Sequence, residues 1–160
     1  MWDGGPVSRR DQILAVTAWQ LVGGLPADPK LRAEFRTRAV GLGPMLVSSG
    51  LAATAAFHAA KAGPNPAKPR ELAYARIADA LGCHVLHRAD ATRNDLVAEV
   101  GAMASTTYAS ASGEARAFAL WVRRAAEALI PRSEQAGNAA ALAGAAAHGP
   151  VGVPDGAGAR

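Results

Sequence analysis

The chain has 160 residues, which is enough for one domain with a buried core, and half of its residues are apolar. Forty residues are alanine and only 5% are aromatic, so the β-branched and aromatic enrichment typical of a β-rich fold is missing. Cys83 is the single cysteine, which excludes a disulfide scaffold and favours a reducing, cytoplasmic location.

The charge balance is modestly basic. Residues 1–131 hold 15 basic and 11 acidic residues and carry the whole net charge of +4. Of the 17 basic residues in the chain, 14 are arginine, whose planar guanidinium suits phosphate and carboxylate groups. This excess is compatible with a polyanionic partner, and high-GC codon usage, which enriches Ala, Gly and Arg together, remains the alternative explanation.

Hydrophobic periodicity predicts an all-α fold: a compact bundle of five to seven helices over residues 1–131, followed by a disordered, Ala/Gly-rich tail over 132–160. The first helix is expected over 8–21, capped by Ser8. Its inward face is a set of small and aliphatic residues at helical spacing, namely Ile13, Leu14, Thr17, Ala18 and Leu21.

The next segment reads as three helical pieces. Asp28 and Pro29 form a start signal, because a capping residue is followed by proline at the first helical position. We expect this helix to end at 41–44, a short piece to cover 44–49, and a further helix to cover 51–62 after an interruption at Gly50.

Three prolines within 63–69 predict an exposed loop, after which a helix should span 70–81 and end or kink at Gly82. A short helix is expected over 92–100, with Thr92 and Asp95 as a capping pair. The last helix should begin near 105 and end before Pro131. The inward face of the helix over 70–81 is Tyr74, Ile77, Ala78, Leu81 and Val85. The inward face of the last helix is Ala115, Phe118, Val122, Ala125, Ala126 and Leu129.

Residues 39–60 form a stretch of 22 residues without a formal charge, about the length that spans a bilayer. The stretch contains three glycines, a proline and several hydroxyl side chains, which is more typical of buried core helices. We also find no basic region followed by an apolar run at the N-terminus, so neither a signal peptide nor a membrane partner is expected.

Cys83, His84, His87 and Asp90 form the one cluster of metal-ligand residue types in the sequence. A small metal-dependent enzyme built on them is one hypothesis, and histidines near the carbonyl end of a helix are the alternative. Phosphate loops, nucleophile elbows and paired carboxylates are absent from the sequence. We therefore expect a protein that is not an enzyme and needs no cofactor.

Basic residues recur on the predicted helices and beside the proline loop, where they suit salt-dependent contact with phosphates. The alternative for each is an ordinary solvated helix face. The residues are Arg32, Arg36 and Arg38; Lys61, Lys68 and Arg70; and Arg116, Arg123 and Arg124.

Two segments are more specific than composition. The first runs from Phe35 through Pro44 to a Gly-Leu pair and ends in Ala-Phe and a lysine, with the key residues Gly50, Leu51, Thr54, Phe57 and Lys61. The second has a tyrosine, a Glu-Ala pair six residues later and a Trp-x-Arg-Arg ending, namely Tyr108, Glu114, Trp121, Arg123 and Arg124. Together they resemble the signature of the small subunit of the type III-B CRISPR RNA-targeting complex, the Cmr complex. Ser49 stands where that family usually has asparagine, and Ala125 where it usually has an aromatic residue.

The resemblance implies a non-catalytic helical subunit that stacks in a short filament and contacts guide and target RNA in antiviral defence. Its partners would be the backbone and large subunits and further copies of itself. Among the basic residues, Arg123 and Arg124 are the best phosphate candidates, followed by Lys61, Arg38, Arg36 and Arg116. Gly50 is expected to allow close packing, Leu51 and Phe57 to fill the core, and Trp121 to lie in the core or at a subunit contact.

A third hypothesis is a helical adaptor that binds only protein, in which the arginines serve solubility. A measurement of RNA binding distinguishes this adaptor from the RNA-contacting subunit. Stoichiometric metal in the purified protein would favour the enzyme hypothesis.

Overall fold

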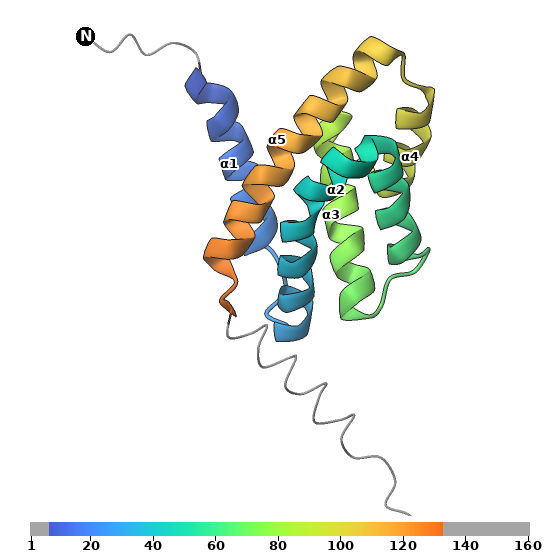
Figure 1. The fold of residues 1–160 in the computed structure, drawn as a ribbon. Coiled ribbons are helices and arrows are strands. Elements are labelled where there is room, and N and C mark those ends of the chain that lie inside the picture. Colours follow the sequence, from blue (N-terminus) through green and yellow to red (C-terminus); the bar gives the residue numbers. More distant parts are fainter. Residues whose placement is uncertain (1–6, 133–160) are drawn as a thin grey trace, which may run out of the picture.

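The computed structural model describes residues 7–132, with the side chains of Val7 and Ser8 left aside. Five α-helices cover this range and no strand occurs within it, which confirms the all-α prediction (Figure 1). The helices are α1 (Val7–Gly23), α2 (Pro29–Ala62), α3 (Pro69–Val85), α4 (Arg93–Ala102) and α5 (Ser105–Leu129). Ser8, predicted as the cap of the first helix, lies inside α1 instead, because the helix already includes Val7. Of the tail predicted over 132–160, residues 133–160 lie outside the described part.

Helix α2 differs most from the sequence-based expectation. It continues through the Gly-Leu-Gly-Pro run, so the predicted end at 41–44 is wrong. Leu42 and Leu46 flank Pro44 and are both buried, so the packing of this stretch offsets the hydrogen bond that proline cannot make. The predicted interruption at Gly50 is confirmed, because Gly50 has φ 81° and ψ 170° in an otherwise helical run.

The break at Gly50 lets α2 change direction, which Figure 1 shows as a bend in the blue-to-green helix. Helix α5 runs antiparallel to the part of α2 before the break. At one end Arg32 Nη2 donates to the Leu129 carbonyl oxygen over 2.8 Å, and at the other the Ala52 N–H donates to the Tyr108 hydroxyl over 3.2 Å. These two hydrogen bonds tie the two longest helices together at both ends.

Helix starts follow the predicted chemistry. The Asp28 carboxylate accepts the Lys30 N–H at 2.9 Å, and Thr92 and Asp95 form a reciprocal capping box at the start of α4. The sequence predicted that α3 would end or kink at Gly82, but the helix continues through this residue to Val85. A Cβ there would approach the Thr92 carbonyl oxygen to 3.0 Å, so this glycine permits α4 to start close against α3.

The core is built from one face of each helix. The inward residues predicted for α3 and α5 are buried, except that Leu129 is partly exposed, and Phe35 and Phe118 are the largest fully buried side chains. In α1 the predicted Leu14 and Ala18 are buried together with Val22, and the predicted Leu21 packs against the core. Thr17, also predicted to face inward, is exposed. Ile13 points outward, with Val16 and Trp19, so an apolar stripe is left on the outer side of α1.

Within residues 7–132, α2 is the one helix long and apolar enough to cross a membrane by length and composition. It packs against α3, α4 and α5, as the central helix of a bundle does. It is also interrupted at Gly50.

Candidate nucleic-acid interface

Three arginines occupy the outer side of α5. Arg116, Arg123 and Arg124 are all exposed, and spacings of seven and eight residues place them on the same side of a helix. We call these three residues the α5 arginine face. Arg116 has no ion-pair partner among the described residues, so its guanidinium is available to an external anion.

The other two arginines of this face are held by neighbours one turn or less away. Arg123 Nε lies 3.1 Å from Glu127 Oε1, and the Arg124 guanidinium carbon lies 5.1 Å from the centre of the Trp121 ring. Trp121 is itself partly buried against the core. One part of Trp121 therefore packs against the core, which is one of the two places considered from sequence, and the rest supports the exposed Arg124.

Glu114, the acidic residue of the second motif, connects three helices. Its carboxylate lies 2.6 Å from Arg10 Nη2 on α1 and 3.5 Å from His84 Nε2 on α3. The His84 ring stacks on Phe118 with centroids 4.7 Å apart. Burial lowers the pKa of His84, and the Glu114 charge opposes that shift. Glu114 thus fixes α5 on its neighbours rather than serving as an isolated acid.

The two motif segments come together in space. Tyr108 of the second segment approaches Gly50 of the first, and a Cβ at Gly50 would lie 3.3 Å from its hydroxyl oxygen. Leu51 is buried, as predicted. A scan against family models matches residues 10–129, nearly the whole of the helical bundle, to the CRISPR-associated protein family Cas_Cmr5.

The chain belongs to this family. It is therefore a CRISPR-associated subunit of the Cmr type, as the two sequence segments indicated. A search of curated proteins gives no match to this chain.

In this Cmr5-family chain, one predicted phosphate contact is wrong. Arg36 is only 8% exposed and lies among the buried residues of α2, because its position on the helix falls on the same side as Ala33 and Ala39. Arg38 is also largely used inside the protein. Its side chain is 20% exposed, pairs with Glu34 at 2.6 Å and lies 4.9 Å from the centre of the Tyr74 ring. Neither belongs to the α5 arginine face.

Phe57 is a second correction. It was expected in the core, but it is 38% exposed at the side of α2. Lys61 lies one turn further along, with its ammonium nitrogen 5.6 Å from the Phe57 ring centre. Sequence reasoning missed this exposed aromatic beside a cation. A signal was present, because no Asp or Glu occurs between Glu34 and Glu71.

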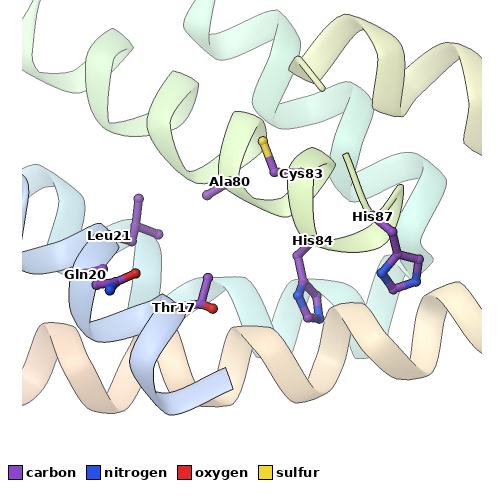
Figure 2. Close-up of a pocket in the computed structure, with 7 residues that line it drawn as sticks. All are labelled: Thr17, Gln20, Leu21, Ala80, Cys83, His84 and His87. Carbon is purple, nitrogen blue, oxygen red and sulfur yellow. The ribbon is translucent and has the colours of Figure 1, made fainter. Parts of the chain in front are cut away.

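The proposed metal-ligand cluster is not assembled. Cys83 Sγ donates to the carbonyl oxygens of Ala89 at 3.4 Å and Ala91 at 3.2 Å, and burial raises the pKa of the thiol. Figure 2 shows the sulfur directed away from the rings of His84 and His87. No group of three or more ligand-type side chains suited to a metal ion occurs within the described residues.

Cys83, His84 and His87 of this cluster instead line an open cleft of about 510 Å³ between α1 and α3 (Figure 2). Thr17, Gln20 and Leu21 form the α1 side, and Ala80, Cys83, His84 and His87 form the α3 side. This lining offers no nucleophile held beside a base, so the catalytic arrangement considered for Cys83 and its neighbours finds no support in the geometry.

Proposed function

We propose that this chain is the non-catalytic small subunit of a type III-B Cmr effector complex in the cytoplasm, and that it contacts RNA phosphates through the α5 arginine face. Membership of the Cmr5 family supports a place in a Cmr assembly. The observation that carries the RNA contact is the alignment of Arg116, Arg123 and Arg124 on one exposed side of a single helix. Such a row of cations binds a sugar–phosphate chain without reading its sequence.

The partner subunits and further copies of the chain need an apolar contact surface as well. Ile13, Val16 and Trp19 are exposed on the outer side of α1 and supply such a surface. Contiguous exposed apolar residues of this kind are typical of protein–protein contacts. The stripe supports an interaction with protein and leaves the α5 arginine face for RNA.

Charge reversal tests the RNA contact. We expect the double variant Arg123→Glu/Arg124→Glu to bind labelled single-stranded RNA at least about tenfold more weakly than the unchanged chain, because several phosphate contacts are lost. The matched control is Arg9→Glu/Arg88→Glu, which makes the same change in net charge at two exposed arginines outside that face. An equal loss of RNA affinity in both variants would show that net charge, rather than the α5 arginine face, governs binding. Circular dichroism should show unchanged helix content in all three proteins.

The non-catalytic role has its own test. RNA incubated with the purified chain, with and without added divalent metal, should remain intact, while the reconstituted complex retains whatever cleavage its other subunits perform. Cleavage by the isolated chain that disappears in Cys83→Ser or His84→Gln would restore the enzyme hypothesis.

If pull-down recovers Cmr subunits but the chain shows no RNA affinity at low salt, the adaptor without RNA contact is the correct description.

A further inference from the structure

Phe57 is an exposed aromatic residue with a rigid support. Its ring makes edge-to-face contacts with His58 and Tyr74, with centroid distances of 5.7 Å and 5.8 Å. His58 and Tyr74 are both buried and contact each other at 5.2 Å, so they form a fixed base behind Phe57. Because the supporting rings are buried, the exposed part of the Phe57 ring is held in one orientation rather than left free to rotate.

The surroundings of this ring are basic. Lys61 is exposed, its ammonium nitrogen lies over this ring at 5.6 Å from the ring centre, and it has no ion-pair partner among the described residues. The 36 residues over 35–70 contain five basic residues and no acidic one, so no carboxylate along this stretch competes for Lys61. Arg70 is exposed one turn before Tyr74 on α3, which adds a second cation at the same end of the bundle.

An exposed aromatic next to unpaired cations is the arrangement with which proteins hold single-stranded nucleic acid, since bases stack on the ring and phosphates meet the charges. A duplex does not engage such a ring, because its bases are stacked on one another. An acidic protein surface would satisfy Lys61, but it gives no reason for a flat, rigidly supported ring. The combination therefore favours an unpaired nucleotide.

We infer that Phe57 is a stacking platform for one unpaired base of RNA, with Lys61 contacting an adjacent phosphate. This inference rests on the proposed RNA-binding function and assigns that function a second site, separate from the α5 arginine face. The site takes a single-stranded RNA segment with little preference among bases, because every base has a π-face.

The test compares three full-length variants with the unchanged chain. Phe57→Leu keeps an apolar side chain of similar size and removes the aromatic face, while Phe57→Trp keeps an aromatic face. Val47→Ala is the matched control, since it shortens another exposed apolar side chain of the same helix, on the other side of the break at Gly50. Affinities for a single-stranded oligouridylate and for an RNA duplex of the same length are measured over the same series of salt concentrations for each protein, and thermal melting is followed for each protein.

We expect Phe57→Leu to lose roughly 5- to 150-fold in affinity for the single strand, the range found for removing one base–aromatic stack. Its affinity for duplex and the salt dependence of its single-strand binding should be unchanged, because no cation is lost. Phe57→Trp and Val47→Ala should bind like the unchanged chain. Unaltered single-strand binding by Phe57→Leu, or an equal loss for single strand and duplex, overturns the stacking platform while the proposed function stands. If the unchanged chain binds no RNA, both fail.

Photocrosslinking gives a readout that does not depend on the folding of a variant. The unchanged chain is irradiated with a single-stranded RNA that carries 5-iodouracil, and the adduct is mapped by mass spectrometry. We expect the adduct on Phe57. Adducts confined to other aromatic residues, with none on Phe57, contradict the inference even if Phe57→Leu proves unstable.

Discussion

The hydroxyl oxygen of Tyr108 on α5 lies 3.3 Å from the point that a Cβ on Gly50 of α2 would occupy. The same hydroxyl accepts the Ala52 N–H at 3.2 Å, which is one of the backbone donors left free where α2 restarts after its break. Each of the two sequence segments that resemble the Cmr small subunit contributes one residue to this contact. The bend in α2 and its attachment to α5 are therefore one structural feature.

Gly50→Ala tests the break itself. Gly50 has φ 81° and ψ 170°, a region that is almost restricted to glycine, and occupying it with another residue costs about 1–3 kcal/mol. We expect the free energy of unfolding, measured with urea, to fall by about this amount. Gly41→Ala is the control, since Gly41 is helical with nothing within 4 Å of its Cβ position, and it should raise stability by about 0.5–1 kcal/mol. Equal effects of the two substitutions would refute this role for Gly50.

Tyr108→Phe removes the hydroxyl and keeps the ring. We expect a loss of about 0.5–1.5 kcal/mol in the free energy of unfolding, because the Ala52 N–H loses its partner. In the double variant with Gly50→Ala, the loss should be smaller than the sum of the two single effects, because the added methyl group then has no hydroxyl to approach. Strict additivity in this cycle would show that the two residues act independently.

Arg93 joins three parts of the chain. Its Nη1 lies 3.2 Å from Asp79 Oδ2 on α3, and its Nη2 donates to the Gly63 carbonyl oxygen at the end of α2 over 3.0 Å. We expect Arg93→Ala to lower the free energy of unfolding by about 1.5–3 kcal/mol, as for hydrogen bonds to charged groups. Arg88→Ala breaks an exposed pair with Glu99 and should cost at most about 1 kcal/mol. A larger effect at Arg88 would reverse this ranking.

Two histidines, the buried His58 and the partly buried His84, make stability depend on pH. Burial is the main cause that lowers the pKa of His58 and of His84 in the folded chain from the ordinary value of 6.5. The Arg38 charge also lowers the pKa of His58, whereas Glu114 opposes the shift at His84. Well above pH 6.5 each histidine is neutral in the folded chain and in the unfolded chain. Below it the unfolded chain takes up protons more readily, so the free energy of unfolding should fall as pH decreases.

Urea unfolding at pH 7.5 and at pH about 5.5 measures this loss, above the range in which carboxylates titrate. The double variant His58→Gln/His84→Gln should show a smaller fall in stability between the two pH values than the unchanged chain. If the fall is the same in both proteins, other groups are responsible for it.

Helices whose starts carry clear capping residues were predicted well from the local sequence. Thr92 with Asp95 and Asp28 with Pro29 mark helix starts that the structure confirms, because a cap needs only residues close in sequence. Pro44 and Gly82 were misread as helix ends, because long-range packing decides whether a helix continues through them. Leu46 buried after the proline and Thr92 close against the glycine are contacts that a single segment cannot reveal.

The candidate site was predicted only in part, for a related reason. Arg116, Arg123 and Arg124 share one side of a single long helix, so their spacing alone predicts that they lie together. Arg36 lies on a buried side of α2 before the break, and its charge led to the expectation that it would be exposed. Phe57 follows the break at Gly50, across which helical periodicity does not indicate which face turns inward. The structure buries the arginine and exposes the aromatic residue, the reverse of the expectation from polarity.

The most direct test of the central claim is the affinity of the full chain for single-stranded RNA as a function of salt concentration. A plot of log K against log[salt] should be linear and fall with a slope of about −0.7 for each phosphate contacted. With the three arginines of the α5 arginine face and Lys61 engaged, we predict a slope near −3, and a shallower slope in Arg123→Glu/Arg124→Glu. RNA affinity that does not change with salt, or no binding even at low salt, would contradict the account.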